Sequence, residues 1–521
     1  MTTALATSLV YMDNGQIQVV PEAKQDVRKA VLAFLDMAST ATGQKTYYNK
    51  KSDQQKAMRD IHDAVFDVNR GLYLAMLSFP GVLDVAVQEG ITKLLKYGRD
   101  EASILTANQE AEAIKLMSSN LKATRLLKMF KMFKDERINK GRVRALVLST
   151  VLGSRNLAWW AVKYRNLVKD VLRHAWGNKY APVVVRAIKS GDQITQRDGV
   201  LLRKCVDKYT QHSKLSQTDI YESVCFVFGA EVDYKNDLFK AFFKAREDLS
   251  AGKKLPPEVL EGIRGRYHKN VSKDKILELT KNTATDKQKL KVQRQAKEAN
   301  VKVEFDPTKL DVTSLYVYAL EEGMTNEVRM ALDSKASYVA AMFPLKYRKV
   351  AVVVDTSASM GGTEVNKNRP LAISLAMRDV LSATGDVSES FATNGEFDDF
   401  GLVKPVGDTS LALAVAKAFQ SDTDVIYIIT DGYENAPAGR VHEVIDAVRE
   451  LGIETPVYQF NPVMATEAAG VRSLSSHVST LPVSKPEGIG LSLIRAAIEQ
   501  DIGRGLQALV DASLPRIARE G

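Results

Sequence analysis

One short segment of the chain carries oxygen-bearing side chains at a spacing suited to a divalent cation. It is a D-x-S-x-S loop, in which Asp355 is followed by Ser357 and Ser359. Both hydroxyls can ligate a hard cation directly, and Asp355 can hold a ligand water and orient them. Thr409 and Asp431, in two later segments, are placed to supply a third hydroxyl and a second carboxylate. We therefore expect Mg²⁺ or Mn²⁺ as cofactor, with one coordination position open, which is a binding chemistry.

The segments around this loop have the pattern of a doubly wound α/β domain. The run KVAVVVD, from Lys349 to Asp355, is rich in β-branched residues, as expected of a parallel strand buried on both faces. Because strands alternate with helical patterns, we predict a Rossmann-like domain with its functional site beyond the carboxyl ends of the strands. Further strands are predicted at 424–430 and 454–460, and helices at 370–383, 410–420 and 439–451.

These residues resemble the metal-ion-dependent adhesion site of the von Willebrand A family. All five positions of that site have a matching residue here, namely Asp355, Ser357, Ser359, Thr409 and Asp431. The resemblance implies a von Willebrand A domain, which we place at residues 346–521. The family's TDNE sequence reads TDGYE here, so the Asp431 carboxylate is retained. The alternative is a set of ordinary strand-end turns and helix caps.

The chain before residue 346 is predicted to be helical. Residues 8–20 alternate around Asn14 and Gly15, which indicates a β-hairpin. From about residue 23 to about residue 300, apolar residues recur at spacings of three and four, beginning with Val27, Val31, Leu32 and Leu35. Many successive amphipathic helices without strands favour a solenoid-like stack. The polar segment 284–300 fits either an exposed helix or a connection.

Charge is divided unequally between the two parts. Residues 346–521 contain 16 Lys and Arg and 23 Asp and Glu, a net charge of −7, so residues 1–345 carry +16. A surplus of this kind indicates a polyanionic partner for the N-terminal part. Lysine-rich helices that are merely well solvated are the alternative.

Two basic runs could follow a nucleic acid strand. A helix predicted over about 155–176 has a core stripe that includes Trp160, Val168 and Leu172, and on another face it carries cations about 6 Å apart, similar to the phosphate spacing of RNA. A second run interleaves lysines with Phe130 and Phe133, whose simpler interpretation is core packing. Contacts of this kind release counterions and make affinity depend on salt. The candidate RNA-binding residues are Lys122, Arg125, Lys128, Lys131, Arg155, Lys163, Arg165, Lys169, Arg173 and His174.

Several segments, in order along the chain, resemble the Ro or TROVE-module family. FLDMAS at 34–39 and TATGQKTYY at 40–48 resemble the family's "FL..GS..GTYY" signature, and KYRNLVKDVLRH at 163–174 resembles "KY…KDLLR..H". LPPEVL at 255–260 is similar to "LPTE.L", and MALD at 330–333, followed by the strand and DTSASM, is similar to the family's passage into the A domain.

This resemblance implies an all-helical ring of HEAT-like repeats at 1–345, the TROVE module, closed by the A domain. It implies binding of small structured non-coding RNA (Y RNA) on the outer surface and of single-stranded ends of defective RNA in the central hole. One departure is the segment 154–161, SRNLAWWA, where the family often has "GRALRKAI". Trp159 or Trp160 could stack on a base there, although buried core aromatics are the simpler interpretation.

No segment nominates a catalytic nucleophile or a general base, so we expect a non-enzymatic RNA-binding scaffold for RNA quality control or decay. The alternative is a metal-dependent protein-binding adaptor of the chelatase or ATPase-associated kind. A metal-dependent nuclease ranks third, because it would need carboxylates clustered on the ion. We also predict a cytoplasmic protein without membrane contact. The two cysteines lack a metal-binding spacing, and the sequence has neither a signal segment nor a long uncharged stretch. Small non-coding RNA is the expected partner, and an exoribonuclease or another protein is a further candidate at the metal site.

Overall fold

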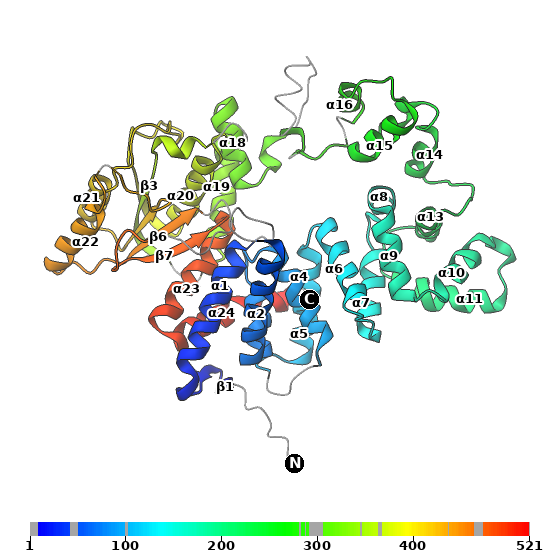
Figure 1. The fold of residues 1–521 in the computed structure, drawn as a ribbon, viewed down its shortest axis with the longest axis horizontal. Helices are drawn as coiled ribbons and strands as arrows, with labels where there is room; N and C mark the ends of the chain where they lie inside the picture. Colours follow the sequence, from blue (N-terminus) through cyan, green and yellow to red (C-terminus); the bar gives the residue numbers. More distant parts are fainter. Residues whose placement is uncertain are drawn as a thin grey trace, which may run out of the picture. The chain divides into compact units, whose positions relative to one another are not determined.

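The computed structural model describes residues 9–41, 50–98, 103–280, 283–286, 288–290, 306–343, 346–362, 367–435, 437–462 and 472–519. They form two compact units (Figure 1). The first unit comprises residues 1–94, 98–119 and 307–521, and the second comprises 95–97 and 120–306. The boundaries of these units follow the contacts between residues, and they do not coincide with the division expected after residue 345. That division stays a prediction. Residues 42–48 of the Ro-like signature, and most of the polar segment 284–300, lie outside the described residues.

A five-stranded parallel sheet forms the centre of the first unit, in the order β4-β3-β5-β6-β7. The three predicted strands are present as β3, β5 and β6, whereas the two strands at the edges escaped prediction. The edge strand β4 reads GDVSESFA, which is largely polar, and β7 contains Pro482. Edge strands tolerate both features because they pair on one side only. The strands are β3 (Tyr347–Val354), β4 (Gly385–Ala392), β5 (Val425–Ile429), β6 (Val457–Pro462) and β7 (Ser479–Val483).

Helices cover both faces of this sheet, as expected for a doubly wound fold. On one face, Val352, Val354 and Tyr427 pack in a core with residues of α19, α20 and α23. On the other face, Ala351 and Val353 pack against α21 and α22. The predicted helices of this part are present as α20, α21 and α22. The helices that follow residue 306 are α18 (Val312–Glu322), α19 (Asn326–Ala340), α20 (Arg369–Ser382), α21 (Ala412–Gln420), α22 (Arg440–Glu450), α23 (Ile489–Gln500) and α24 (Ile502–Arg519).

The N-terminal helices of the first unit pack against its C-terminal helices. Helix α1, blue in Figure 1, lies beside the red α23, and α3 contacts α24. Arg495 forms an ion pair with Asp36, and the Ser484 hydroxyl donates to the Ser39 carbonyl at 2.7 Å. The predicted hairpin is also present, with Asn14 and Gly15 both at positive φ, as its two-residue turn requires. The elements are β1 (Val10–Asp13), β2 (Gln16–Val19), α1 (Lys24–Thr40), α2 (Lys51–Val68), α3 (Arg70–Leu77), α4 (Asp84–Lys96) and α5 (Ala107–Asn120).

A buried histidine lies between α2 and α3. The Nδ1 atom of His62 lies 2.6 Å from the Tyr73 hydroxyl, and the ring packs edge-on against Phe34. Burial lowers the pKa of His62 to about 3, with a further contribution from the charge of Lys93. The folded unit therefore holds this imidazole neutral.

Acid should destabilise the first unit through His62. Below about pH 6.5, His62 becomes protonated in the unfolded chain, whereas in the folded protein it stays neutral down to about pH 3. We expect the free energy of unfolding to fall by up to about 1.4 kcal/mol per pH unit in this window. Urea unfolding at pH 7.5 and pH 5 checks this on the wild type and on His62→Phe, which should lose less stability between the two pH values. Equal losses in the two proteins would contradict the assignment.

The described part of the second unit is helical. One expectation was wrong here: the continuous helix predicted over about 155–176 is broken at Tyr164, whose φ of −122° and ψ of 33° are not helical. Two shorter helices result, because Tyr164 ends α8 and begins α9. The helices are α6 (Ala123–Asp135), α7 (Gly141–Leu152), α8 (Leu157–Lys163), α9 (Arg165–Trp176), α10 (Tyr180–Lys189), α11 (Gln196–Leu202), the π-helical η3 (Arg203–Asp207), α12 (Lys208–Thr210), α13 (Gln217–Phe228), α14 (Asp237–Lys244), α15 (Pro257–Tyr267) and α16 (Asp274–Thr280).

Among the described residues, none of the helices combines the length and the apolar character needed to cross a bilayer.

Candidate functional site

The predicted metal-binding residues gather at one edge of the parallel sheet. Asp355 directly follows β3, and one residue, Thr430, separates Asp431 from the end of β5. These two strands are neighbours in the sheet, and they are the pair at which the strand order β4-β3-β5-β6-β7 reverses direction. In open α/β sheets this switch point is where the strand ends leave room for a ligand.

Asp355 is fully buried and organises the D-x-S-x-S loop. Its Oδ1 accepts the Ser357 N–H at 3.0 Å, and its Oδ2 accepts the Thr430 hydroxyl at 2.8 Å. The hydroxyl oxygens of Ser357 and Ser359 lie 3.1 Å apart, at the start of the 3-10 turn η6 (Ala358–Gly361). Two hydroxyls are thus held side by side next to a carboxylate.

The loop that carries Thr409 is tied to this segment through its backbone. The Ala358 N–H donates to the Gly407 carbonyl at 2.9 Å, and the buried Thr409 donates its own N–H to the Asn435 side chain at 2.9 Å. Thr430 and Asn435 are supporting residues that the sequence reasoning missed. Thr430 directly precedes Asp431 at the end of a buried strand. That position in the sequence could have identified Thr430 as a supporting residue.

The charges at this edge fit a cation. Burial raises the pKa of Asp431; the N–H of Tyr433 opposes this shift, and the nearby charge of Asp355 adds to it. Hydroxyl and carboxylate oxygens are donors that hard divalent cations prefer. Within the described residues no cluster of three or more His, Cys, Asp or Glu is present that could hold a metal ion.

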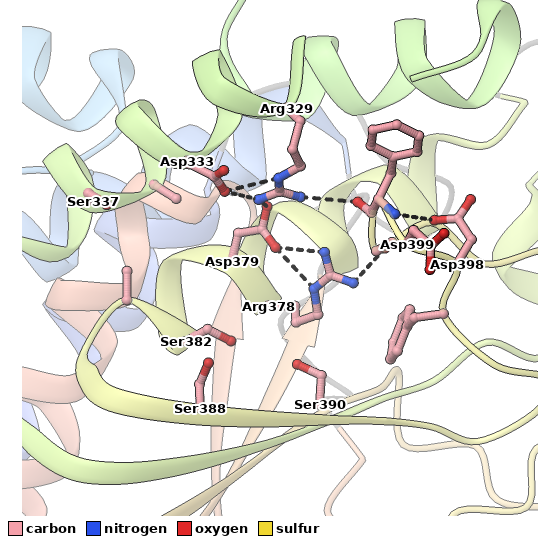
Figure 2. Close-up of a pocket in the computed structure, with 15 residues that line it drawn as sticks. Arg329, Asp333, Ser337, Arg378, Asp379, Ser382, Ser388, Ser390, Asp398 and Asp399 are labelled. Atoms are coloured by element: carbon pink, nitrogen blue, oxygen red, sulfur yellow. Dashed lines mark hydrogen bonds and ion pairs between the residues drawn. The ribbon is translucent and has the colours of Figure 1, made fainter. Parts of the chain in front are cut away.

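A cavity of about 780 Å³ lies elsewhere in the first unit, beside a buried charge network (Figure 2). Asp379 on α20 accepts from Arg378 Nε at 3.0 Å and from Arg329 Nη2 at 2.7 Å. The Tyr316 hydroxyl on α18 also donates to this carboxylate. The network therefore links α18 and α19 to α20, a helix that packs on one face of the sheet.

This cavity is poorly suited to a phosphate. Arg378 Nη1 donates to the Gly401 carbonyl at 2.6 Å, and Arg329 pairs with Asp333 as well as Asp379, so both guanidinium groups are engaged within the protein. In Figure 2 the side chains of Ser382, Ser388 and Ser390 lie on the wall opposite Arg329. The other charged groups that line the cavity, Asp333, Asp379, Asp398 and Asp399, are carboxylates, which repel an anion.

Positive charge is concentrated in the second unit. Residues 121–210, which span α6 to α12, contain 21 Lys and Arg and only 6 Asp and Glu, a net charge of +15. All ten candidate RNA-binding residues lie in this stretch. The +16 of the N-terminal part is thus carried almost entirely by one run of helices.

Helix α6 and the residue before it hold four of the candidates. Lys122, Lys128 and Lys131 are exposed, and Arg125 is half-buried. Phe130 and Phe133 are fully buried, with ring centroids 5.6 Å apart. The interleaved aromatics of this run therefore belong to the core, and its lysines face solvent.

Helix α9 carries Arg165, Lys169 and Arg173, and two of the three lie against aromatic rings. The Arg165 guanidinium is 4.7 Å from the centre of the Phe226 ring, and burial lowers its pKa. Arg173 is exposed and lies 5.8 Å from the centre of the Phe228 ring. The row of cations predicted from the sequence is thus uneven, with Arg165 partly committed to packing.

The remaining candidates differ in whether their side chains already contact other residues of the protein. Arg155 is exposed, whereas Lys163 pairs with Glu258 at 3.1 Å. The Nε2 atom of His174 lies 2.9 Å from the Ile138 carbonyl, the bond expected of a structural helix-end histidine. No interaction with RNA is tested by this geometry, so all ten assignments stay predictions.

Comparison with solved structures gives a likeness in fold. No protein-family model matches the chain, and none of the curated proteins matches it. The fold is similar to the crystal structure of the Deinococcus radiodurans Ro (RSR) protein, with a TM-score of 0.35 and 13% identity, over 90% of this chain and 99% of that one.

Proposed function

We propose that this chain is a non-enzymatic RNA-binding scaffold of the Ro type, which binds small structured non-coding RNA and single-stranded RNA ends in RNA quality control or decay. The observation that carries the proposal is the net charge of +15 over residues 121–210, with exposed cations on α6 and α9. Phosphates are the natural partners of such a surface, because each neutralised contact releases counterions.

Electrophoretic mobility shift at low salt tests this function. A stem-loop RNA and an unstructured oligonucleotide of the same length should both be retarded by the purified chain. A protein of equal size with an acidic surface serves as the control. Absence of a shift with both RNAs at low salt rejects the proposal.

We further propose that Asp355, Ser357, Ser359, Thr409 and Asp431 hold one divalent cation, Mg²⁺ or Mn²⁺. The support is the gathering of their loops at the β3 and β5 ends, with two hydroxyls 3.1 Å apart and with Asp431 close enough to Asp355 for their charges to interact. When bound, the cation would offer an open position to a carboxylate or a water. Capture of a partner protein there, the adaptor function, stays a prediction.

Replacing Asp355 by Ala should weaken cation binding and leave RNA affinity unchanged. The carboxylate accepts the Ser357 N–H and fixes the loop, so its loss should weaken Mg²⁺ or Mn²⁺ binding by roughly 10-fold to 100-fold. Calorimetric titration checks this. Asp431→Ala should behave alike, and Asp422→Ala, at an exposed carboxylate away from the site, should bind as the wild type does. Unchanged metal uptake in Asp355→Ala would contradict the ligand assignment.

A further inference from the structure

Helix α8 of the second unit borders a cavity of about 450 Å³ with aromatic walls. Trp160 is buried and forms part of the core, whereas Trp159 is half-buried and faces the cavity from the same helix. Tyr164 closes the wall at the break between α8 and α9. The lining residues are Ala123, Asn156, Trp159, Trp160, Tyr164 and Thr283, which we call the α8 pocket.

The α8 pocket also holds a few polar groups. The Thr124 hydroxyl donates to the Tyr164 hydroxyl at 2.9 Å, which leaves the phenolic proton of Tyr164 available to another acceptor. The Asn156 side chain is exposed, and its amide makes no hydrogen bond to the part of the chain that the structure describes. An amide offers both a donor and an acceptor. A hollow with aromatic side chains on its wall and a few polar groups beside them has the usual form of a small-ligand site.

Three of the residues that line this hollow are each preceded in the chain by a cation. Lys122 directly precedes Ala123, Arg155 precedes Asn156 and Lys163 precedes Tyr164, so three lining residues each have a cation as chain neighbour, with Cα atoms about 3.8 Å apart. Lys122 and Arg155 are exposed, whereas Lys163 is engaged with Glu258. Two cations are therefore accessible beside an aromatic cavity.

We propose that the α8 pocket receives one unstacked nucleobase of single-stranded RNA. The base stacks on Trp159, Asn156 and the Tyr164 hydroxyl contact its edge, and Lys122 and Arg155 contact the flanking phosphates. This inference rests on the proposed RNA-binding function and adds to it the site at which one unpaired base is held. A paired base cannot enter such a pocket, because it must first leave the helical stack.

Substitution of Trp159 tests the proposal. Base stacking on an aromatic side chain contributes enough that Trp159→Ala should weaken binding of a single-stranded oligonucleotide by roughly 10-fold to 100-fold. Trp159→Phe keeps a stacking face and should retain most of the affinity. Tyr180→Ala is the matched control, since Tyr180 is an exposed aromatic of the same unit outside the pocket. Circular dichroism verifies that each variant is folded.

Fluorescence anisotropy with a labelled single-stranded oligonucleotide and with a labelled duplex measures these affinities. The single-stranded affinity of Trp159→Ala should fall while its duplex affinity stays unchanged. A 2-aminopurine in the single strand should be quenched by the wild type and by Trp159→Phe and not by Trp159→Ala. A free mononucleotide should bind far more weakly than the strand, because it lacks the flanking phosphates.

The outcomes separate this inference from the proposed function. If the wild type binds both RNAs and Trp159→Ala binds the single strand equally well, the pocket assignment is overturned and the RNA-binding function stands. Equal losses on the single strand and the duplex would also overturn it, since only an unpaired base can enter. If the wild type binds neither RNA, both proposals are overturned.

Discussion

Raising the salt concentration from 50 to 200 mM should lower the affinity of this protein for structured RNA by roughly 10³-fold. About six phosphate contacts produce a loss of this size, because each contact returns a condensed counterion to the RNA when the complex dissociates. Exposed cations on α6, α9 and the turn before α8 provide most of that number, and they include Lys122, Lys128, Lys131, Arg155 and Arg173. A mobility-shift or anisotropy titration across the salt series measures the slope.

Charge-removing variants make this expectation specific to the second unit. Lys128→Ala combined with Lys131→Ala should reduce the slope of log affinity against log salt by about 2, because two contacts are lost. The matched control is Lys404→Ala with Lys417→Ala, two exposed lysines of the acidic C-terminal part. An equal effect of both pairs, or a slope near zero in the wild type, would show that α6 is not an RNA-binding surface.

Replacing Asp379 by Asn should cost the first unit about 3 to 5 kcal/mol of unfolding free energy. This carboxylate is buried between Arg378, which is also buried, and Arg329. Its neutralisation leaves guanidinium charge in the interior without a counter-charge, which is the costly way to break a buried ion pair. Urea unfolding monitored by circular dichroism provides the free energy.

Asp333→Asn is the matched control, because it removes the other carboxylate partner of Arg329. The Asp333 side chain is 59% exposed, against 8% for Asp379, so solvent screens its ion pair. We expect a loss of at most about 1 kcal/mol from this variant. Similar losses in the two variants would mean that the network around Asp379 contributes little to stability.

The sequence by itself indicated the D-x-S-x-S loop and the strands that place it. The D-x-S-x-S motif is contiguous, and β3 and β5 are buried on both faces, so their apolar runs are continuous and easily read. Parallel strands bring their carboxyl ends to one edge, which places Asp355 and Asp431 together without knowledge of the packing. The basic character of the N-terminal part was equally visible, since charge is a property of composition.

Tertiary structure decided the features that depend on contacts between distant segments. The polar edge strand β4 escaped prediction because an edge strand needs no continuous apolar pattern. No local pattern distinguishes Arg155, which is exposed, from Lys163, which Glu258 engages, because that ion pair joins residues 95 positions apart. The break at Tyr164, the Asp379 network and the α8 pocket likewise arise from packing. Their free energies come from burial and pairing across the fold, and residue spacing along the chain does not encode either one.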